Sequence, residues 1–233
     1  MSFRQLEDDD HHHGATPLCN LPINMIKAFP IDYMHLVCLG VMRHLILAWV
    51  QGKPGQARLA AQDIRNLSQT LVSYVHYTPS DFSRKPRELK EIKRNKATEY
   101  RQLLLYTGPV AFKNVLSEDA YGHFMLFHVA MSLLIRKCTT IEQKKYCKEL
   151  LKMFVSHSPK IYGTECLVYN MHGLLHLADD SKNYGCLDDF SGFCFENYLQ
   201  KLKKIVRTPN RPLQQVIRRL GEMEDLQDRK SVV

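Results

Sequence analysis

The segment 32–50 constrains the fold most, because it is apolar on nearly every side of the helix that it predicts. A helix of this kind is normally buried among other helices. Pro30 and Asp32 supply start signals, while Gly52 and Pro54 end the pattern. We therefore expect a buried helix at the centre of the fold.

Most of the remaining chain also carries apolar residues at three- and four-residue spacing, which is typical of helices. The predicted helices cover residues 56–77, 97–106, 117–137, 140–155, 168–178, 195–206 and 212–226. We find neither an internal repeat nor a convincing alternating strand. The sequence therefore predicts a mainly α fold.

The domain organisation follows from length and composition. A chain of 233 residues is long enough for one ordinary core or two small ones, since domains typically hold roughly 100 to 200 residues. We expect a polar loop or truncated edge over residues 1–30, one helical region over 31–226 and a tail over 227–233. A hydrophobic share of 45% and a charged share of 24% argue against a disordered or fibrous chain.

Several classes of function are disfavoured by the sequence. The apolar run 124–135 is interrupted by His128 and Ser132 and is shorter than the roughly 20 residues of a membrane helix, so we expect no membrane partner. The seven cysteines are odd in number and contain no CxxC pair, which argues against a disulfide framework and a cysteine zinc knuckle. We expect a reducing compartment.

The formal net charge of +8 attracts polyanions such as DNA. The first basic stretch, residues 84–96, holds seven cations against two acids, and such a run is usually a solvated face. The second lies between Phe195 and Leu220, where Glu196 is the only acid. Its cations, which we predict to contact DNA, are Lys201, Lys203, Lys204, Arg207, Arg211, Arg218 and Arg219.

Two pairs of residues have the spacing of metal ligands. Asp32 and His35 are three positions apart, and His172 and His176 are four apart, so each pair shares one face of a helix. Two such helices packed together would offer four ligands to one structural Zn²⁺. Alternatively, Asp32 is a helix N-cap and the two downstream histidines are core imidazoles bonded to backbone carbonyls.

Glu196 also has two interpretations. On a helix it shares one stripe with Lys203 and Arg207, because these positions are close to whole numbers of turns apart. A carboxylate beside cations is most often an ordinary surface ion pair. The same arrangement suits a metal-binding acid beside a phosphate track.

Together these elements resemble the carboxy-terminal half of CACTA-type (En/Spm-like) DDE transposases and their animal relatives. The resemblance rests on the segment Phe29-Pro-Ile-Asp-Tyr-Met-His and its apolar continuation, on His172-x3-His176, and on Phe195-Glu-Asn-Tyr-Leu with the basic residues that follow. The three elements occur in the family's order. The paired histidines precede Glu196 by 20 positions (196 − 176).

The resemblance implies a helical insertion and the C-terminal helices of a ribonuclease-H-like domain in which three carboxylates hold two Mg²⁺ ions. Glu196 matches the final acid, while Asp32, His35, His172 and His176 match the family's Asp/Cys-x-x-His and paired-histidine elements. The first two aspartates belong upstream, and we expect them to be missing here. Asp8, Asp9 and Asp10 lack a strand pattern. The resemblance also implies a nuclear protein that assembles on DNA ends as a homo-oligomer.

The leading interpretation is therefore a transposase-derived fragment that is inactive alone. The main alternative is a non-catalytic helical module that binds DNA or protein, with a structural zinc ion. A third is a cytosolic helical protein whose charge only confers solubility.

Overall fold

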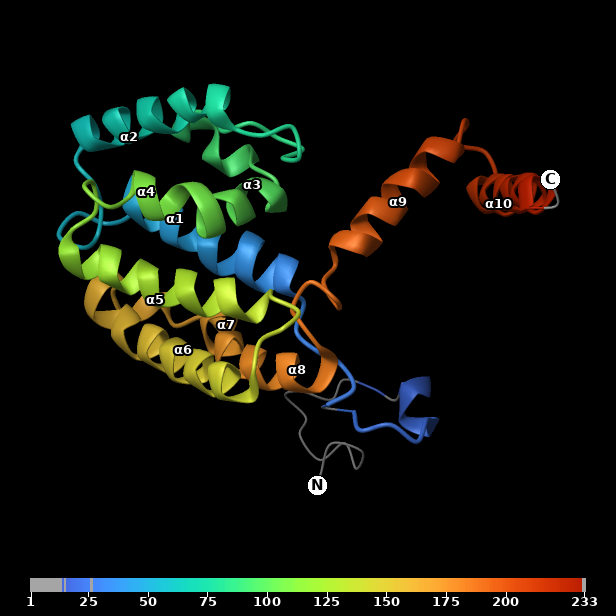
Figure 1. Cartoon of the computed structure of the whole chain (residues 1–233), viewed down its shortest axis with the longest axis horizontal. Helices are drawn as coiled ribbons and strands as arrows, with labels where there is room; N and C mark the ends of the chain where they lie inside the picture. Colours follow the sequence, from blue (N-terminus) through green and yellow to red (C-terminus); the bar gives the residue numbers. More distant parts are fainter. Residues whose placement is uncertain (1–13, 15, 26, 232–233) are drawn as a thin grey trace. The chain divides into compact units, whose positions relative to one another are not determined.

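The structure is a computed structural model that describes residues 14, 16–25 and 27–231, with side chains as far as residue 226 (Figure 1). Helices make up its regular structure, and no strand occurs in these ranges. The mainly α prediction is confirmed. The chain divides into two units, Met1–Phe190 and Ser191–Val233.

The first unit contains all but two of the helical elements of the described residues. Up to the middle of the chain these are η2 (Pro17–Asn20), η3 (Met34–Met42), α1 (Arg43–Gln51), α2 (Ala61–Ser73), η4 (Tyr74–Tyr77), η5 (Leu89–Arg94), α3 (Ala97–Gln102), η6 (Leu103–Thr107) and α4 (Gly108–Ala111). Then follow α5 (Glu118–Leu134), α6 (Ile141–Tyr162), η7 (Thr164–Cys166), α7 (Tyr169–Gly173), η8 (Leu174–His176) and α8 (Leu177–Tyr184). The second unit contains α9 (Phe193–Ile205) and α10 (Pro212–Ser231).

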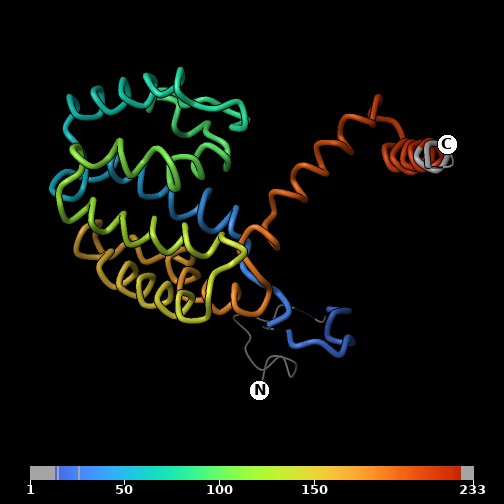
Figure 2. The backbone as a smooth tube through the Cα atoms, in the orientation of Figure 1, coloured from blue at the N-terminus to red at the C-terminus, as the bar shows by residue number. Residues whose placement is uncertain are grey.

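The predicted central helix is present as the continuous pair η3 and α1, which ends at Gly52. Its first half is a π-helix, with more residues per turn than an α-helix. Figure 1 shows it between the layer of α2, α3 and α4 and the group α5 to α8, and Figure 2 traces the same path. Trp49 is buried there, with its ring centroid 5.0 Å from that of Phe112 and 5.9 Å from that of Phe124.

The same helix, Met34–Gln51, is long and apolar enough to cross a membrane by length and composition alone. Half of these residues are buried inside the fold, and the core helix of a globular protein meets the same criterion. This helix is longer than the apolar run 124–135, on which the sequence-based expectation of no membrane segment depends. His35, Arg43 and His44 interrupt its apolar residues, so the sequence does not show it as one long apolar run.

Helices α5 and α6 pack against each other along their length and support the central helix from one side (Figure 1). Both have their N-caps at the residues where the predicted helices 117–137 and 140–155 begin. Ser117 Oγ accepts a hydrogen bond from the Ala120 amide at 3.3 Å, and Thr140 forms a reciprocal capping box with Gln143. Local side-chain chemistry therefore sets these two boundaries.

Residues 191–226 form a separate unit, although the sequence predicts one region over 31–226. The break was not visible because helical apolar spacing continues on both sides of it. Within the second unit, Gln215 holds the connection between the helices: its Oε1 accepts from the Arg207 amide at 2.9 Å, and its Nε2 donates to the Thr208 carbonyl at 3.0 Å. No residue of α9 is buried.

Candidate metal-ligand and nucleic-acid surfaces

The helices that carry the two predicted ligand pairs pack directly against each other. Glycines permit the close approach: a Cβ at Gly173 would lie 2.7 Å from Leu36 Cδ1, and one at Gly40 would lie 2.7 Å from Asn170 Nδ2. The amide of Ile31 donates to Asp180 Oδ2 at 2.9 Å. The beginning of η3 therefore runs antiparallel to α7 and the start of α8.

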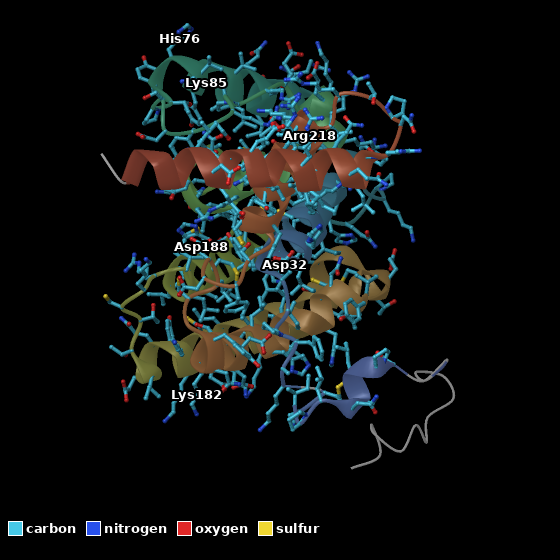
Figure 3. All side chains as sticks on the ribbon, turned by 90° about the vertical axis from the view of Figure 1, so that its right-hand side faces the viewer. Asp32, His76, Lys85, Lys182, Asp188 and Arg218 are labelled. Atoms are coloured by element: carbon cyan, nitrogen blue, oxygen red, sulfur yellow. The ribbon has the colours of Figure 1, made fainter. Side chains whose placement is uncertain are left out.

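Asp32 caps the central helix. Its Oδ1 accepts a hydrogen bond from the Met34 amide at 3.0 Å, and its Oδ2 accepts one from the His35 amide at 3.2 Å. The same Oδ2 contacts His35 Nδ1. Of the two interpretations that the sequence leaves open for Asp32, the geometry shows the capping role. Figure 3 labels this residue.

His172 and His176 are exposed, so they are not the core imidazoles of the alternative interpretation. Their Nε2 atoms lie 3.3 Å apart. Two nitrogen ligands of one tetrahedral zinc, each about 2.0 to 2.1 Å from the metal, are separated by about 3.3 Å. The pair therefore has the geometry of two ligands to a single ion.

A third ligand does not join this pair in the structure. Within residues 14, 16–25 and 27–231, no three His, Cys, Asp or Glu side chains gather where they could hold a metal ion. The helices meet, but the four predicted ligands do not form one set. The contact with Asp32 occupies His35 Nδ1 and leaves its Nε2 as the nitrogen that a metal could take.

His123 is buried in the fold, and the sequence predicts no role for it. His123 Nε2 lies 2.8 Å from the Phe154 carbonyl oxygen and 3.2 Å from Ser158 Oγ, and its ring stacks on Phe154. Burial lowers the pKa of His123 to about 4. In the sequence this residue lies within an ordinary apolar helical pattern, so nothing distinguishes it.

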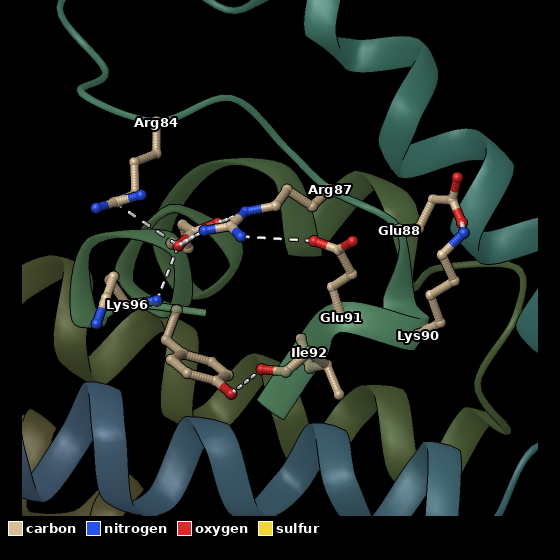
Figure 4. A network of polar contacts seen from close by, with 9 residues as sticks. Arg84, Arg87, Glu88, Lys90, Glu91, Ile92 and Lys96 are labelled. Atoms are coloured by element: carbon tan, nitrogen blue, oxygen red, sulfur yellow. Dashed lines mark hydrogen bonds and ion pairs between the residues drawn. The ribbon is translucent and has the colours of Figure 1, made fainter. Parts of the chain in front are cut away.

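The basic stretch 84–96 is anchored on a buried acid, Glu99 (Figure 4). Only 4% of the Glu99 side chain is exposed. Arg87 Nε and Nη2 donate to its two oxygens at 2.7 and 2.8 Å, and the Lys96 amide donates at 2.8 Å. Arg84 Nε lies 3.9 Å from the same carboxylate. Glu99 lies beyond the run itself, so the sequence gives no sign of this pairing.

Two further cations of this stretch have partners. Lys90 Nζ lies 2.6 Å from a carboxylate oxygen of Glu88, and Lys85 Nζ donates to the Thr78 carbonyl. Four of the seven cations are therefore bonded within the fold.

The predicted DNA-binding cations of the second unit fall into two groups. None of the described acids lies within ion-pair distance of Lys201, Lys203 and Lys204 on α9, or of Arg207 and Arg211 in the connection after it. In contrast, Arg218 and Arg219, on α10, lie 2.9 and 2.7 Å from the oxygens of Glu222. Glu196 is exposed in the first turn of α9. The cations that are free to meet phosphate are therefore those of α9 and of the connection to α10.

No family model, curated protein or solved structure matches this chain. Asp8, Asp9 and Asp10 lie outside the described residues.

Proposed function

We propose that this chain is a transposase-derived fragment, part of a metal-dependent domain for DNA strand cleavage and transfer. The observation that carries the proposal is that Glu196 shares one face of α9 with Lys203, while Arg207 follows just after that helix ends at Ile205. The acid lies in the first turn of α9, Lys203 is close to two whole turns from it, and neither Lys203 nor Arg207 has an acidic partner among the described residues. A carboxylate in line with free cations suits a metal ligand beside a phosphate track.

The apolar stripe of the same helix supports this proposal. Phe195, Tyr198 and Leu199 are exposed, whereas large apolar side chains on a helix normally pack on another layer. In the transposases that the sequence resembles, the helix with the last acid belongs to a ribonuclease-H-like domain with strands. We propose that such a layer covers this stripe in the complete enzyme, which would be nuclear and would assemble on DNA ends as a homo-oligomer.

Mg²⁺, when bound by the complete enzyme, would activate water and then a 3′ hydroxyl for strand cleavage and transfer. The described residues do not fit a two-metal site, because Glu196 is a single carboxylate and no three potential ligands gather among them. We therefore assign no catalytic step to this chain alone. Glu196 would contribute one ligand, while Lys203 and Arg207 hold the phosphate backbone.

Duplex binding without metal tests the role of Glu196. In EDTA its charge repels phosphate, so Glu196→Gln should tighten binding of a short duplex by about two- to fivefold. Added Mg²⁺, at constant ionic strength, should strengthen binding of the native chain more than that of the variant. Glu224→Gln, an exposed acid on α10, is the matched control. Equal affinity of native chain and Glu196→Gln in EDTA would make Glu196 an ordinary surface acid.

Strand cleavage provides a second test. We expect the purified chain to show no Mg²⁺-dependent nicking of duplex DNA, because one acid of three cannot hold two metals. Robust nicking that Glu196→Gln abolishes would show that acids other than those proposed complete the site.

A helical DNA- or protein-binding module with a structural zinc is the second candidate, and the 3.3 Å separation of the His172 and His176 Nε2 atoms favours it. These two imidazoles, with His35 Nε2, would hold the ion. Co²⁺ added to the purified chain should then give the visible absorption of a tetrahedral site. His172→Ala should abolish that signal, and His76→Ala, at another exposed histidine, should leave it unchanged. Absence of the signal in the native chain would rule out this zinc site.

A further inference from the structure

Two aromatic rings of the first unit, Phe82 and Tyr106, are in contact, and the exposed Tyr77 immediately precedes Thr78, whose carbonyl bonds Lys85. The rings of Phe82 and Tyr106 meet edge to face, with centroids 5.2 Å apart. Tyr106 nevertheless keeps 54% of its surface exposed, and Tyr77 keeps 84%. These tyrosines come from η6 and η4, while Phe82 comes from the loop before η5. We call Tyr77, Phe82 and Tyr106 the aromatic surface.

Cations border the aromatic surface. Lys85 Nζ donates to the carbonyl of Thr78, the residue after Tyr77, so its ammonium lies beside that end of the surface. Arg84 follows Phe82 by two residues, and 45% of its side chain is exposed. Figure 3 labels Lys85 and shows it on this unit. Each ammonium or guanidinium keeps further N–H donors for a second partner.

We propose that the aromatic surface binds single-stranded nucleic acid, with bases stacked on Tyr77 and Tyr106 and phosphates bonded to Arg84 and Lys85. Proteins that bind single strands combine exposed rings for stacking with cations along the backbone. Base pairs of a duplex are already stacked on one another, so only unpaired bases offer a free face to these rings. This inference goes beyond the proposed function, which places duplex phosphates on α9.

The experiment uses single strands that carry a fluorescent base. The probes are dT20 and rU20 with one central 2-aminopurine, and a duplex of the same length. The native chain should bind a single strand and quench the 2-aminopurine, because that base stacks on a tyrosine. In Tyr77→Leu/Tyr106→Leu the rings are lost, so affinity should fall about tenfold or more and the quenching should disappear. Preference between dT20 and rU20 identifies the sugar.

Matched variants separate stacking from other causes. Tyr77→Phe/Tyr106→Phe keeps the rings and should bind within about twofold of the native chain. Tyr146→Leu, at an α6 tyrosine that is also 54% exposed, should not weaken binding. If the double Leu variant is misfolded by Trp49 fluorescence, Tyr77→Leu alone should still weaken binding severalfold.

The proposal is overturned if the two Leu variants bind single strands as tightly as Tyr146→Leu, or if the strands bind without any change in 2-aminopurine fluorescence. The proposed function is tested by duplex binding, which replacement of Lys203 and Arg207 should weaken. The present inference is tested by single-strand binding, so each proposal can fail without the other.

Discussion

The cations of residues 84–96 in the first unit and those of α9 in the second are alike in the sequence, but the fold uses them differently. In the first unit, Arg87 forms two hydrogen bonds with buried Glu99, and Lys90 pairs with Glu88. In the second unit, none of the described acids pairs with Lys203, on α9, or with Arg207, just after it. Arg87 and Lys90 are therefore held by acids of the fold, whereas Lys203 and Arg207 present their charge to solvent.

The role of a basic stretch therefore depends on whether its cations are paired with acids of the fold, and not on its density of charge. Glu99 lies on α3, after the run, and it is the only charged side chain of the ion pairs in Figure 4 that is nearly fully buried. A buried carboxylate must be compensated by cations and N–H donors. The run 84–96 supplies both: the cations Arg84 and Arg87 and the backbone amide of Lys96.

The largest expected effect is on the stability of the first unit. Glu99→Gln removes the charge that Arg87 and the Lys96 amide contact, and it leaves the guanidinium of Arg87 without its main partner. We expect the free energy of unfolding to fall by about 2 to 4 kcal/mol, less than for a fully buried pair because Arg87 is partly exposed. Urea unfolding followed by the fluorescence of Trp49, the single tryptophan, measures it.

Glu91→Gln is the matched control for this prediction. Glu91 lies 3.5 Å from Arg87 on the solvent side, with 39% of its side chain exposed. Its loss should cost less than about 1 kcal/mol. Equal effects of the two substitutions would mean that Glu99 does not anchor the basic stretch.

A smaller effect is expected from buried His123, which distinguishes the first unit from α9, where no residue is buried. Burial lowers the pKa of His123 to about 4. As the pH falls, this imidazole is therefore protonated near pH 6.5 in the unfolded chain but only near pH 4 in the folded chain. Stability should therefore fall as the pH falls through this window, by on the order of 2 to 3 kcal/mol.

His123→Gln should remove this loss, so its unfolding free energy should change less between pH 7 and pH 4.5 than that of the native chain. His76→Gln, at an exposed histidine of η4, should behave as the native chain does. A native-like pH dependence in His123→Gln would assign the acid sensitivity to other groups.

Much of the fold could be predicted from the sequence because helices leave local signals. The all-round apolar pattern of 32–50 indicated the central helix, and Ser117 and Thr140 marked the starts of α5 and α6. The π-winding of η3 and the boundary at residue 190 left no such signal. Both depend on how segments pack, and the amphipathic pattern does not change across them.

The candidate sites were predicted less completely. Spacing correctly placed His172 and His176 on one face, and the glycine contacts bring their helix against η3. Spacing could not show that both carboxylate oxygens of Asp32 accept hydrogen bonds from amides at the start of the central helix. It also could not show that Arg218 and Arg219 share Glu222, because the sequence window that favoured DNA binding ended at Leu220.

The smallest expected effect concerns DNA, where the comparison between the two basic regions can be tested directly. Lys203→Ala/Arg207→Ala removes two cations without acidic partners among the described residues, one on α9 and one just after it, and each phosphate contact contributes about 0.9 to the slope of log affinity against log salt. We expect the slope for duplex binding to become shallower by up to about two. Lys90→Ala removes a cation that is paired with Glu88 within the fold, so its slope should stay within about half a unit of the native value. Fluorescence anisotropy with one duplex at several salt concentrations measures both. If Lys90→Ala makes the slope shallower by about one unit, this cation binds phosphate despite its internal partner, and the distinction between the two regions does not hold.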